Sequence, residues 1–217
     1  MSHTLATIWR SLHRDGLVSS AALLVKELHH YGRFLLLSKQ LEAGEVAQYA
    51  QDHIRLAGPA DLDRIAYAWP SEFGDRSLEA LRWKLTSRYE KGHPCLLSES
   101  NGQIQGAVWC IPWNPPNQGP IPQEPDGTFE ICNLFVAPQC RGKGIARQLL
   151  AGALSLMADR GKTRAYSRIM PGRQASIAVH INIGFHMLGV LHSSTTFGRE
   201  RSRLVPLTKS RQPDLQG

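Results

Sequence analysis

Apolar residues recur every three or four positions along residues 5–50, and this spacing predicts a helical N-terminal extension. Leu24, Leu28, Tyr31 and Leu35 would share one face of such a helix. Two roles are open for the extension. It packs against the rest of the chain or against a second subunit in a homodimer, or it lies as an amphipathic helix on a membrane surface.

After residue 51 the apolar positions predict shorter elements joined by turns. Pro59 stands near the start of one apolar-periodic stretch, and Ser77 is a suitable N-cap for the next. The expected elements are a strand over 52–58, a helix over 59–69, a second helix from Ser77 to Gly92, and a hairpin whose turn is Asn101-Gly102.

A proline-rich segment interrupts this pattern. Residues 112–125 contain six prolines, which cannot supply N–H donors to a central strand. A connection of this length is typical of either a functional lid or a disordered loop.

The pattern then predicts a strand, a helix and a second strand. A buried strand is expected over 128–138, an amphipathic helix over 144–161, and another strand over 163–170. A short helix ending at Gly184 and two closing strands would follow. This order predicts an α/β (α+β) fold in which a crossover helix joins two parallel strands of a mixed sheet.

We therefore expect three parts along the chain. They are a helical extension over residues 1–50, one folded domain over 51–208, and a flexible tail over 209–217.

Composition and charge limit which partners, cysteine-based sites and cellular location are expected for the protein. Of 217 residues, 42% are hydrophobic and the net charge is +7. Residues 161–217 hold nine basic and two acidic side chains, which favours a phosphate or an acidic surface as partner. The four cysteines show no C-x-x-C spacing, so neither a zinc site nor a redox pair is indicated. With no apolar run long enough to span a bilayer and no secretory leader pattern, the expected location is the cytoplasm.

The turn before the predicted helix 144–161 carries the clearest chemical signal. Gly142 and Gly144 permit positive φ and leave the backbone uncovered, while Arg141 and Lys143 add positive charge. The unpaired N–H groups at the start of a helix attract anions. The pattern fits neither a P-loop nor a Rossmann fingerprint, so it predicts a pyrophosphate site of another kind.

The residues Arg141-x-x-Gly144-x-Ala146 resemble the R/Q-x-x-G-x-G/A signature of the GNAT superfamily of acyl-CoA-dependent N-acetyltransferases. The later stretch HINIGF also resembles a family motif in which a helix runs into Gly-Phe. The resemblance covers roughly residues 52–207 and implies a mostly antiparallel, twisted sheet flanked by helices.

The resemblance implies that the ligand is acetyl-CoA or another acyl-CoA, serving as co-substrate. Its pantetheine arm would lie between the strands 128–136 and 163–170, which splay apart in this family. The residues expected to bind it are Leu134, Phe135, Val136, Gln139, Arg141, Gly142, Lys143, Gly144, Ile145 and Ala146.

Acetyl transfer to an amine needs a base, and Glu130 is at the place where family members with a catalytic glutamate often carry it. Flanking apolar residues are expected to desolvate its carboxylate. The alternative is a structural glutamate that is paired with Arg164 or Arg168.

The developing negative charge on the thioester oxygen needs a donor, for which we expect the backbone N–H of Phe135 or a neighbour. The apolar positions change parity between Ile131 and Leu134, which indicates a β-bulge around Cys132-Asn133.

His180 stands where the family usually has tyrosine, so it is a candidate acid for the leaving thiolate. The alternative is a histidine that packs or caps a short helix.

The acceptor is expected to be an amine of a small molecule or sugar, close to an aromatic wall of Trp69, Phe73, Trp109 and Trp113. Acidic residues nearby (Glu72, Asp75, Glu124 and Asp126) would suit a cationic amine. Two other functions stay open: a non-catalytic acyl-CoA-binding sensor or scaffold, and a nucleic-acid-binding module. Against the nucleic-acid-binding function, the basic C-terminal quarter lacks the interleaved aromatic residues of a stacking surface.

Overall fold

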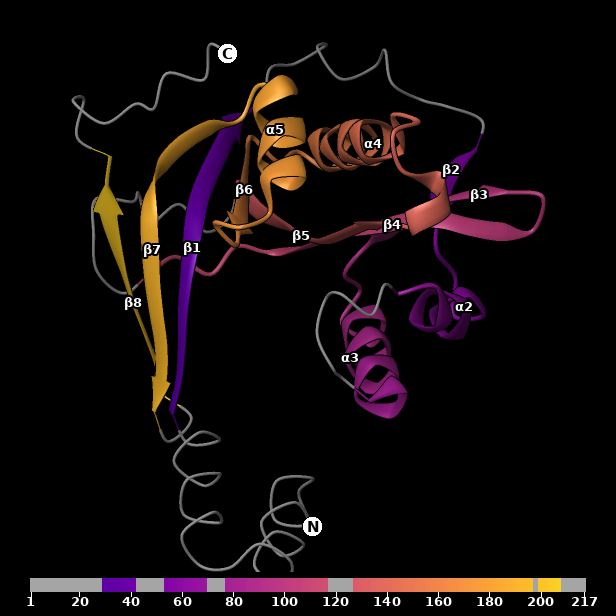
Figure 1. Ribbon diagram of the computed structural model, residues 1–217, viewed down its shortest axis with the longest axis horizontal. Coiled ribbons are helices and arrows are strands. Elements are labelled where there is room, and N and C mark those ends of the chain that lie inside the picture. Colours follow the sequence, from indigo (N-terminus) through magenta and orange to yellow (C-terminus); the bar gives the residue numbers. More distant parts are fainter. Residues whose placement is uncertain (1–28, 42–52, 70–76, 117–126, 197–198, 208–217) are drawn as a thin grey trace, which may run out of the picture. The chain divides into compact units, whose positions relative to one another are not determined.

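The computed structural model describes residues 29–41, 53–69, 77–116, 127–196 and 199–207 (Figure 1). The chain divides into two compact units. In the described parts, the larger unit comprises residues 35–115 and 127–188, and the smaller comprises 29–34 and 189–207.

The described residues contain eight strands and four helices, and the sheet of the larger unit is open and mostly antiparallel, as the sequence predicted. The strands are β1 (His29–Gln40), β2 (Ile54–Leu56), β3 (Cys95–Ser100), β4 (Gln103–Pro112), β5 (Thr128–Val136), β6 (Arg164–Ile169), β7 (His186–Thr196) and β8 (Arg199–Pro206). The helices are α2 (Asp61–Ala68), α3 (Leu78–Glu90), α4 (Ile145–Asp159) and α5 (Gln174–Asn182).

In the larger unit the strand order is β2-β3-β4-β5-β6-β1. The pairs β2–β3, β3–β4, β4–β5 and β6–β1 are antiparallel, whereas β5 and β6 are parallel. α4 joins these two parallel strands, which confirms the predicted crossover.

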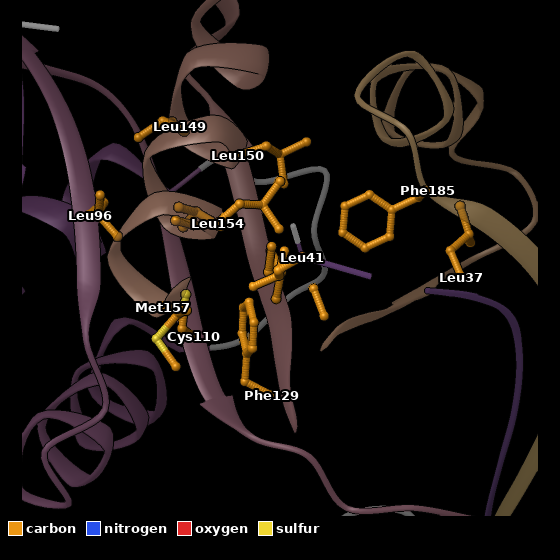
Figure 2. Close-up of a cluster of buried hydrophobic side chains, with 14 of the residues drawn as sticks. Leu37, Leu41, Leu96, Cys110, Phe129, Leu149, Leu150, Leu154, Met157 and Phe185 are labelled. Atoms are coloured by element: carbon orange, nitrogen blue, oxygen red, sulfur yellow. The ribbon is translucent and has the colours of Figure 1, made fainter. Parts of the chain in front are cut away.

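The helices cover opposite faces of this sheet, with α4 and α5 on one side and α2 and α3 on the other (Figure 1). Figure 2 shows Leu149, Leu150, Leu154 and Met157 of α4 in the buried cluster on the first face, which also contains Phe129 of β5. The second face buries a separate cluster that includes Leu85, Trp109 and Phe135. The sheet is therefore the middle layer of three, and β5 buries side chains on both of its faces.

Local signals explain the ends of several elements. The Ser77 hydroxyl accepts a hydrogen bond from the Ala80 N–H at 3.2 Å, as expected of an N-cap. Asn101 and Gly102 both have positive φ, 50° and 73°, which suits the two-residue turn of the β3–β4 hairpin.

Asp61 at the start of α2 is buried for a structural reason. Its carboxylate accepts hydrogen bonds from Arg55 at 2.6 and 2.8 Å, from Arg64 at 2.8 Å and from the Gly58 N–H at 2.9 Å. The Arg55 hydrogen bonds hold the pKa of Asp61 well below its usual range. This network fixes α2 against the β2–β3 edge.

The predicted N-terminal helix is wrong over residues 29–40, which form β1. From Leu35 to Gln40 this strand pairs with β6, so the sheet begins before residue 51. Leu36 and Leu37 are both fully buried although neighbours on a strand point to opposite faces. A strand that is buried on both faces has apolar residues at successive positions. It therefore lacks the apolar–polar alternation that would distinguish a strand from a helix in the sequence. The helix predicted for residues 5–28 and 42–50, the proline-rich residues 117–126, and the tail 209–217 lie outside the described residues.

In the smaller unit, β7 and β8 form an antiparallel hairpin from Gly189↔Pro206 to Thr196↔Arg199. The Tyr31 hydroxyl hydrogen-bonds Nδ1 of His192 on β7. The catalytic candidates Glu130, Phe135 and His180 all belong to the larger unit.

Candidate active site

The glycine-rich turn is an open backbone surface at the start of α4. Gly142 and Gly144 have φ of 75° and 78°, a region that disfavours other residues. A Cβ added at either glycine would meet no atom within 4 Å, so the space above the turn is clear. The glycines are therefore needed for the backbone path, and they also leave that backbone accessible.

The first N–H groups of α4 face this open turn. The Gln148 N–H donates to the Gly144 carbonyl at 3.1 Å, so the amides before it lie ahead of the helical ladder. Arg141 Nε donates to the Val136 carbonyl at 3.3 Å and ties the turn to the end of β5. Lys143 is exposed beside it. A pyrophosphate would suit this place, because it could accept hydrogen bonds from the first N–H groups of α4. The positive end of the helix dipole and the charges of Arg141 and Lys143 would also attract it.

The other residues expected to bind the co-substrate surround this turn. Gln139 is exposed, Ala146 is half-buried, and the Ile145 side chain is 5% exposed and packs in the core. Only its backbone can therefore contact a ligand. Leu134 and Val136 pack against the core on the α4 face, whereas Phe135 belongs to the cluster on the α2–α3 face.

β5 and β6 stop pairing beside this region. Their parallel register covers only Thr128↔Arg164, Phe129↔Ala165 and Glu130↔Tyr166, although both strands continue. The Ser167 hydroxyl donates to the Ile131 carbonyl at 3.2 Å, where a backbone bond would otherwise be expected. The regular backbone pairing of β5 with β6 therefore ends after Glu130.

The predicted β-bulge is present on β5. Cys132 pairs with Trp109 and Phe135 with Ala107, so Asn133 and Leu134 together oppose one residue of β4. Asn133 has φ of 55°, a left-handed conformation uncommon outside glycine. The bulge breaks the regular β4–β5 ladder close to the point where the pairing of β5 with β6 ends.

Glu130 is buried and ion-paired. The side chain of Arg168 donates two hydrogen bonds to its carboxylate, from Nε at 3.0 Å and from Nη2 at 2.6 Å. Arg164, the other partner considered, instead donates to Gln40. Each carboxylate oxygen keeps a second lone pair, so the pair orients the Glu130 carboxylate without using all its capacity to accept.

An aromatic pair lies beside the Arg168 side of this ion pair. Trp113 stacks on Tyr166 with ring centroids 4.2 Å apart, and the Arg168 guanidinium lies 5.7 Å from the Trp113 centroid. Trp109 is fully buried and Trp69 packs on Phe135, so these two belong to the core. Trp113 is also buried, with 6% of its surface exposed. Phe73 and the four acidic residues proposed to attract an amine lie outside the described residues.

Sequence reasoning missed a cationic group contributed by α3. Lys84 and Arg88, four residues apart and hence on one helical face, both reach the Asn133 side chain. The spacing was visible in the sequence, but nothing there showed that this face meets the bulge.

His180 is a buried, neutral histidine in this fold. Its Nδ1–H donates to the Ser176 carbonyl at 2.7 Å, and its ring meets Phe185 edge-on at 5.0 Å. Nε2 is buried without a partner in the described structure. Burial lowers the pKa of His180 to about 4, so the ring is uncharged at neutral pH. Its role as an acid stays a prediction, and it requires that Nε2 first gain a proton.

This burial predicts an acid-sensitive fold. Because the pKa of His180 lies below the ordinary value of 6.5, the unfolded chain binds the proton more tightly and stability falls as pH drops from 6.5 toward 4. At pH 5 the loss is about 2 kcal/mol. Urea unfolding at pH 7 and pH 5 should show this loss in the wild type and a smaller one in His180→Phe. The control is His186→Gln, which removes an exposed imidazole; if it abolishes the effect equally, the assignment to His180 is wrong.

Two further observations concern metal binding and membrane insertion. Within the described ranges, no three His, Cys, Asp or Glu side chains gather in a way that could hold a metal ion. Of the helices that the structure describes, none has the length and apolar character to cross a membrane.

Comparison with known proteins identifies the family. Residues 60–185, more than half of the chain, match the sequence model of the acetyltransferase (GNAT) family. The chain belongs to the GNAT family of acetyltransferases. The resemblance seen in the Arg141–Ala146 turn is thereby confirmed.

Named proteins with similar sequences support this family assignment. The GNAT chain is 29% identical over 160 residues to the L-amino acid N-acyltransferase MnaT of Escherichia coli, covering 67% of this chain and 87% of that one. It is 28% identical over 100 residues to N-acetyltransferase 8 of Rattus norvegicus, covering 46% of this chain but only 42% of the relative. These relatives are N-acyl- or N-acetyltransferases by name, and this chain is an acetyltransferase.

Solved GNAT structures show the same architecture. The yncA acetyltransferase of Salmonella typhimurium, solved with acetyl-CoA, is 26% identical with a TM-score of 0.51, covering 75% of this chain and 97% of that one. A GNAT acetyltransferase of Colwellia psychrerythraea has a TM-score of 0.56 at 15% identity, covering 84% and 63% of the two chains. At that identity the second likeness concerns the fold alone.

Proposed function

We propose that this GNAT protein transfers an acetyl group from acetyl-CoA directly to an amine of a small-molecule or sugar acceptor. The observation that carries the proposal is the open turn at Gly142 and Gly144, next to the point where β5 and β6 separate. A similar Salmonella protein was solved with acetyl-CoA, which supports the choice of donor.

The proposed binding roles follow from what each group can donate. The N–H groups from Gln139 to Ala146, with Arg141 and Lys143, would hold the pyrophosphate. Backbone amides of Leu134, Phe135 and Val136 would bind the arm along the separated edge of β5. The Phe135 N–H, next to the bulge, would donate to the carbonyl oxygen of the thioester as negative charge develops there.

The proposed proton transfers use Glu130 and His180. Glu130, oriented by Arg168, takes a proton from the acceptor ammonium or from its attacking nitrogen. The new N–C bond forms as the C–S bond breaks, and the thiolate then needs a proton. His180 would provide it only after Nε2 has been protonated, since its Nδ1–H is held by Ser176.

The proposal is tested by calorimetric titration of the protein with acetyl-CoA, followed by a screen for amine-dependent CoA release. We expect saturable binding of acetyl-CoA and turnover with at least one amine. Absence of binding would contradict the assignment of the glycine turn. Binding of acetyl-CoA without turnover of any amine would favour a non-catalytic sensor instead.

A further inference from the structure

We infer that Gly106 of β4 is a positioning residue for the co-substrate. Because it has no side chain, the peptide between Phe135 and Val136 turns toward β4, and this aims the Val136 N–H at the pantetheine arm of acetyl-CoA. The inference rests on the proposed function. It adds a residue on a different strand from the glycine-rich turn, on which binding of the arm depends.

Gly106 lies very close to the backbone of the neighbouring strand β5. A Cβ at this position would stand 2.5 Å from the Phe135 carbonyl oxygen and 3.3 Å from the Val136 Cα. Non-bonded carbon and oxygen atoms do not pack at 2.5 Å, so any other residue here would force the backbone to move. Glycine in a strand often marks such a close approach of another backbone.

The direction of the Phe135 carbonyl explains this short distance. Carbonyl groups of a regular ladder lie between the strands, near the plane of the sheet, whereas a Cβ stands out from one face. Leu149 of α4 lies 3.1 Å from the same point, which is therefore on the α4 face of the sheet. The Phe135 carbonyl is turned out of the plane toward that face, into the space that Gly106 leaves.

This contact comes directly after the β-bulge of β5. Regular pairing with β4 resumes there with Phe135↔Ala107 and Val136↔Gly106. A bulge bends its strand and increases the local twist, so the first peptides after it do not lie flat against the partner strand. Glycine opposite Val136 gives the bent strand the room that it needs.

The other end of the turned peptide is the Val136 N–H. A peptide is planar and trans, so a carbonyl directed toward β4 directs the N–H to the opposite side. The Ala137 N–H donates to the Gln105 carbonyl of β4 at 2.8 Å, and successive residues of a strand direct their N–H groups to alternate edges. The Val136 N–H therefore faces away from β4. In the described part of the chain, pairing of β5 with β6 ends at Glu130, so β6 does not take this amide.

A second glycine has the same steric surroundings and supplies a matched control. Among the glycines that the structure describes, only Gly106 and Gly189 would place a Cβ within 3 Å of a backbone oxygen. For Gly189 of β7 this atom is the Val205 carbonyl oxygen, at 2.2 Å. Both residues belong to the smaller unit, which contains none of the residues proposed to bind the co-substrate.

The test titrates the whole chain, as wild type and as Gly106→Ala, with two ligands at a temperature where both proteins are folded. One ligand is acetyl-CoA, and the other is ADP, which has a pyrophosphate but no pantetheine arm and is measured by displacement of acetyl-CoA. We expect Gly106→Ala to weaken acetyl-CoA binding about 10-fold, the effect of losing one hydrogen bond, and to leave the affinity for ADP unchanged. A general loosening of the fold would lower both affinities.

Two further variants separate the possible causes. Gly189→Ala introduces a comparable clash in the smaller unit and should keep both affinities, whatever its effect on stability. The double variant Gly106→Ala/Leu149→Val removes the Cδ atoms of Leu149 beside the new methyl group but leaves the Phe135 carbonyl where it is. We expect the double variant to bind acetyl-CoA as weakly as Gly106→Ala does.

Amide hydrogen exchange in the wild type tests the same contact without a substitution, and it decides the matter if Gly106→Ala does not fold. The Val136 N–H should exchange about 10-fold more slowly with acetyl-CoA bound than with ADP bound, because only acetyl-CoA carries the arm that accepts from it.

The outcomes distinguish this inference from the proposed function. It is overturned if Gly106→Ala binds acetyl-CoA like the wild type, loses both ligands equally, or loses no more than Gly189→Ala does. Recovery of affinity in the double variant, or equal Val136 exchange with the two ligands, would also overturn it. Absence of acetyl-CoA binding by the wild type would instead contradict the proposed function.

Discussion

Replacing Arg141 with glutamate is expected to weaken acetyl-CoA binding by about 100-fold or more. The substitution removes a cation that can form charge-assisted hydrogen bonds, each contributing roughly 1.5–3 kcal/mol, and places a carboxylate where phosphate oxygens would lie. Arg141 also ties the turn to Val136, so the variant loosens the turn as it reverses the charge.

Calorimetric titration of Arg141→Glu against the wild type measures this effect. Arg160→Glu makes the same charge change at the exposed far end of α4 and should leave the affinity for acetyl-CoA close to that of the wild type. If both variants lose affinity equally, net charge rather than the turn attracts the ligand. If neither does, the pyrophosphate is bound elsewhere.

Glu130→Gln is expected to lower kcat by about 10²–10⁴-fold, the usual contribution of general-base catalysis, with little change in acetyl-CoA affinity. The glutamine keeps the shape of the side chain but cannot accept the proton from the amine. The measurement is steady-state CoA release over a range of pH, together with calorimetric affinity for acetyl-CoA.

The Glu130–Arg168 pair allows a sharper control than a second glutamate variant would. Arg168→Gln breaks the same ion pair from the opposite side but leaves the carboxylate in place. A catalytic base should tolerate this change with kcat reduced by about 10-fold or less, and with an altered pH profile. Equal losses of kcat in the two variants would show that the pair is needed as a unit for structure. Because breaking a buried pair costs roughly 3–5 kcal/mol, both variants must be assayed below their melting transitions.

Much of the fold was predictable because each signal was local. Ser77 as an N-cap, Asn101-Gly102 as a hairpin turn and the parity change between Ile131 and Leu134 each depend on a few neighbouring residues. The positive φ at Gly144 follows from the same kind of signal. β1 escaped prediction because its pairing with β6 is distant, and because burial on both faces removed the alternation typical of a strand.

The candidate site was predictable in its backbone and less so in its side chains. The glycine turn and Glu130 could be found from sequence because the family fixes their spacing. The sequence left Arg164 and Arg168 as alternative partners of Glu130 and indicated no partner for Asn133, because Arg168 lies on another strand and Arg88 reaches the bulge from a helix more than 40 residues earlier. These contacts depend on tertiary packing between elements that are distant in the sequence.

Because β1 pairs with β6, the sheet of this protein can be completed only late in its synthesis. Gln40 and its partner Arg164 are separated by 124 residues, and a ribosome that adds about 5–20 residues per second needs roughly 6–25 s to bridge them. During that time the apolar run around Leu36 and Leu37 has emerged without the strand that will cover its edge. The nascent chain must keep this segment from aggregating, and the sheet can be completed only after α4 and β6 have been synthesised.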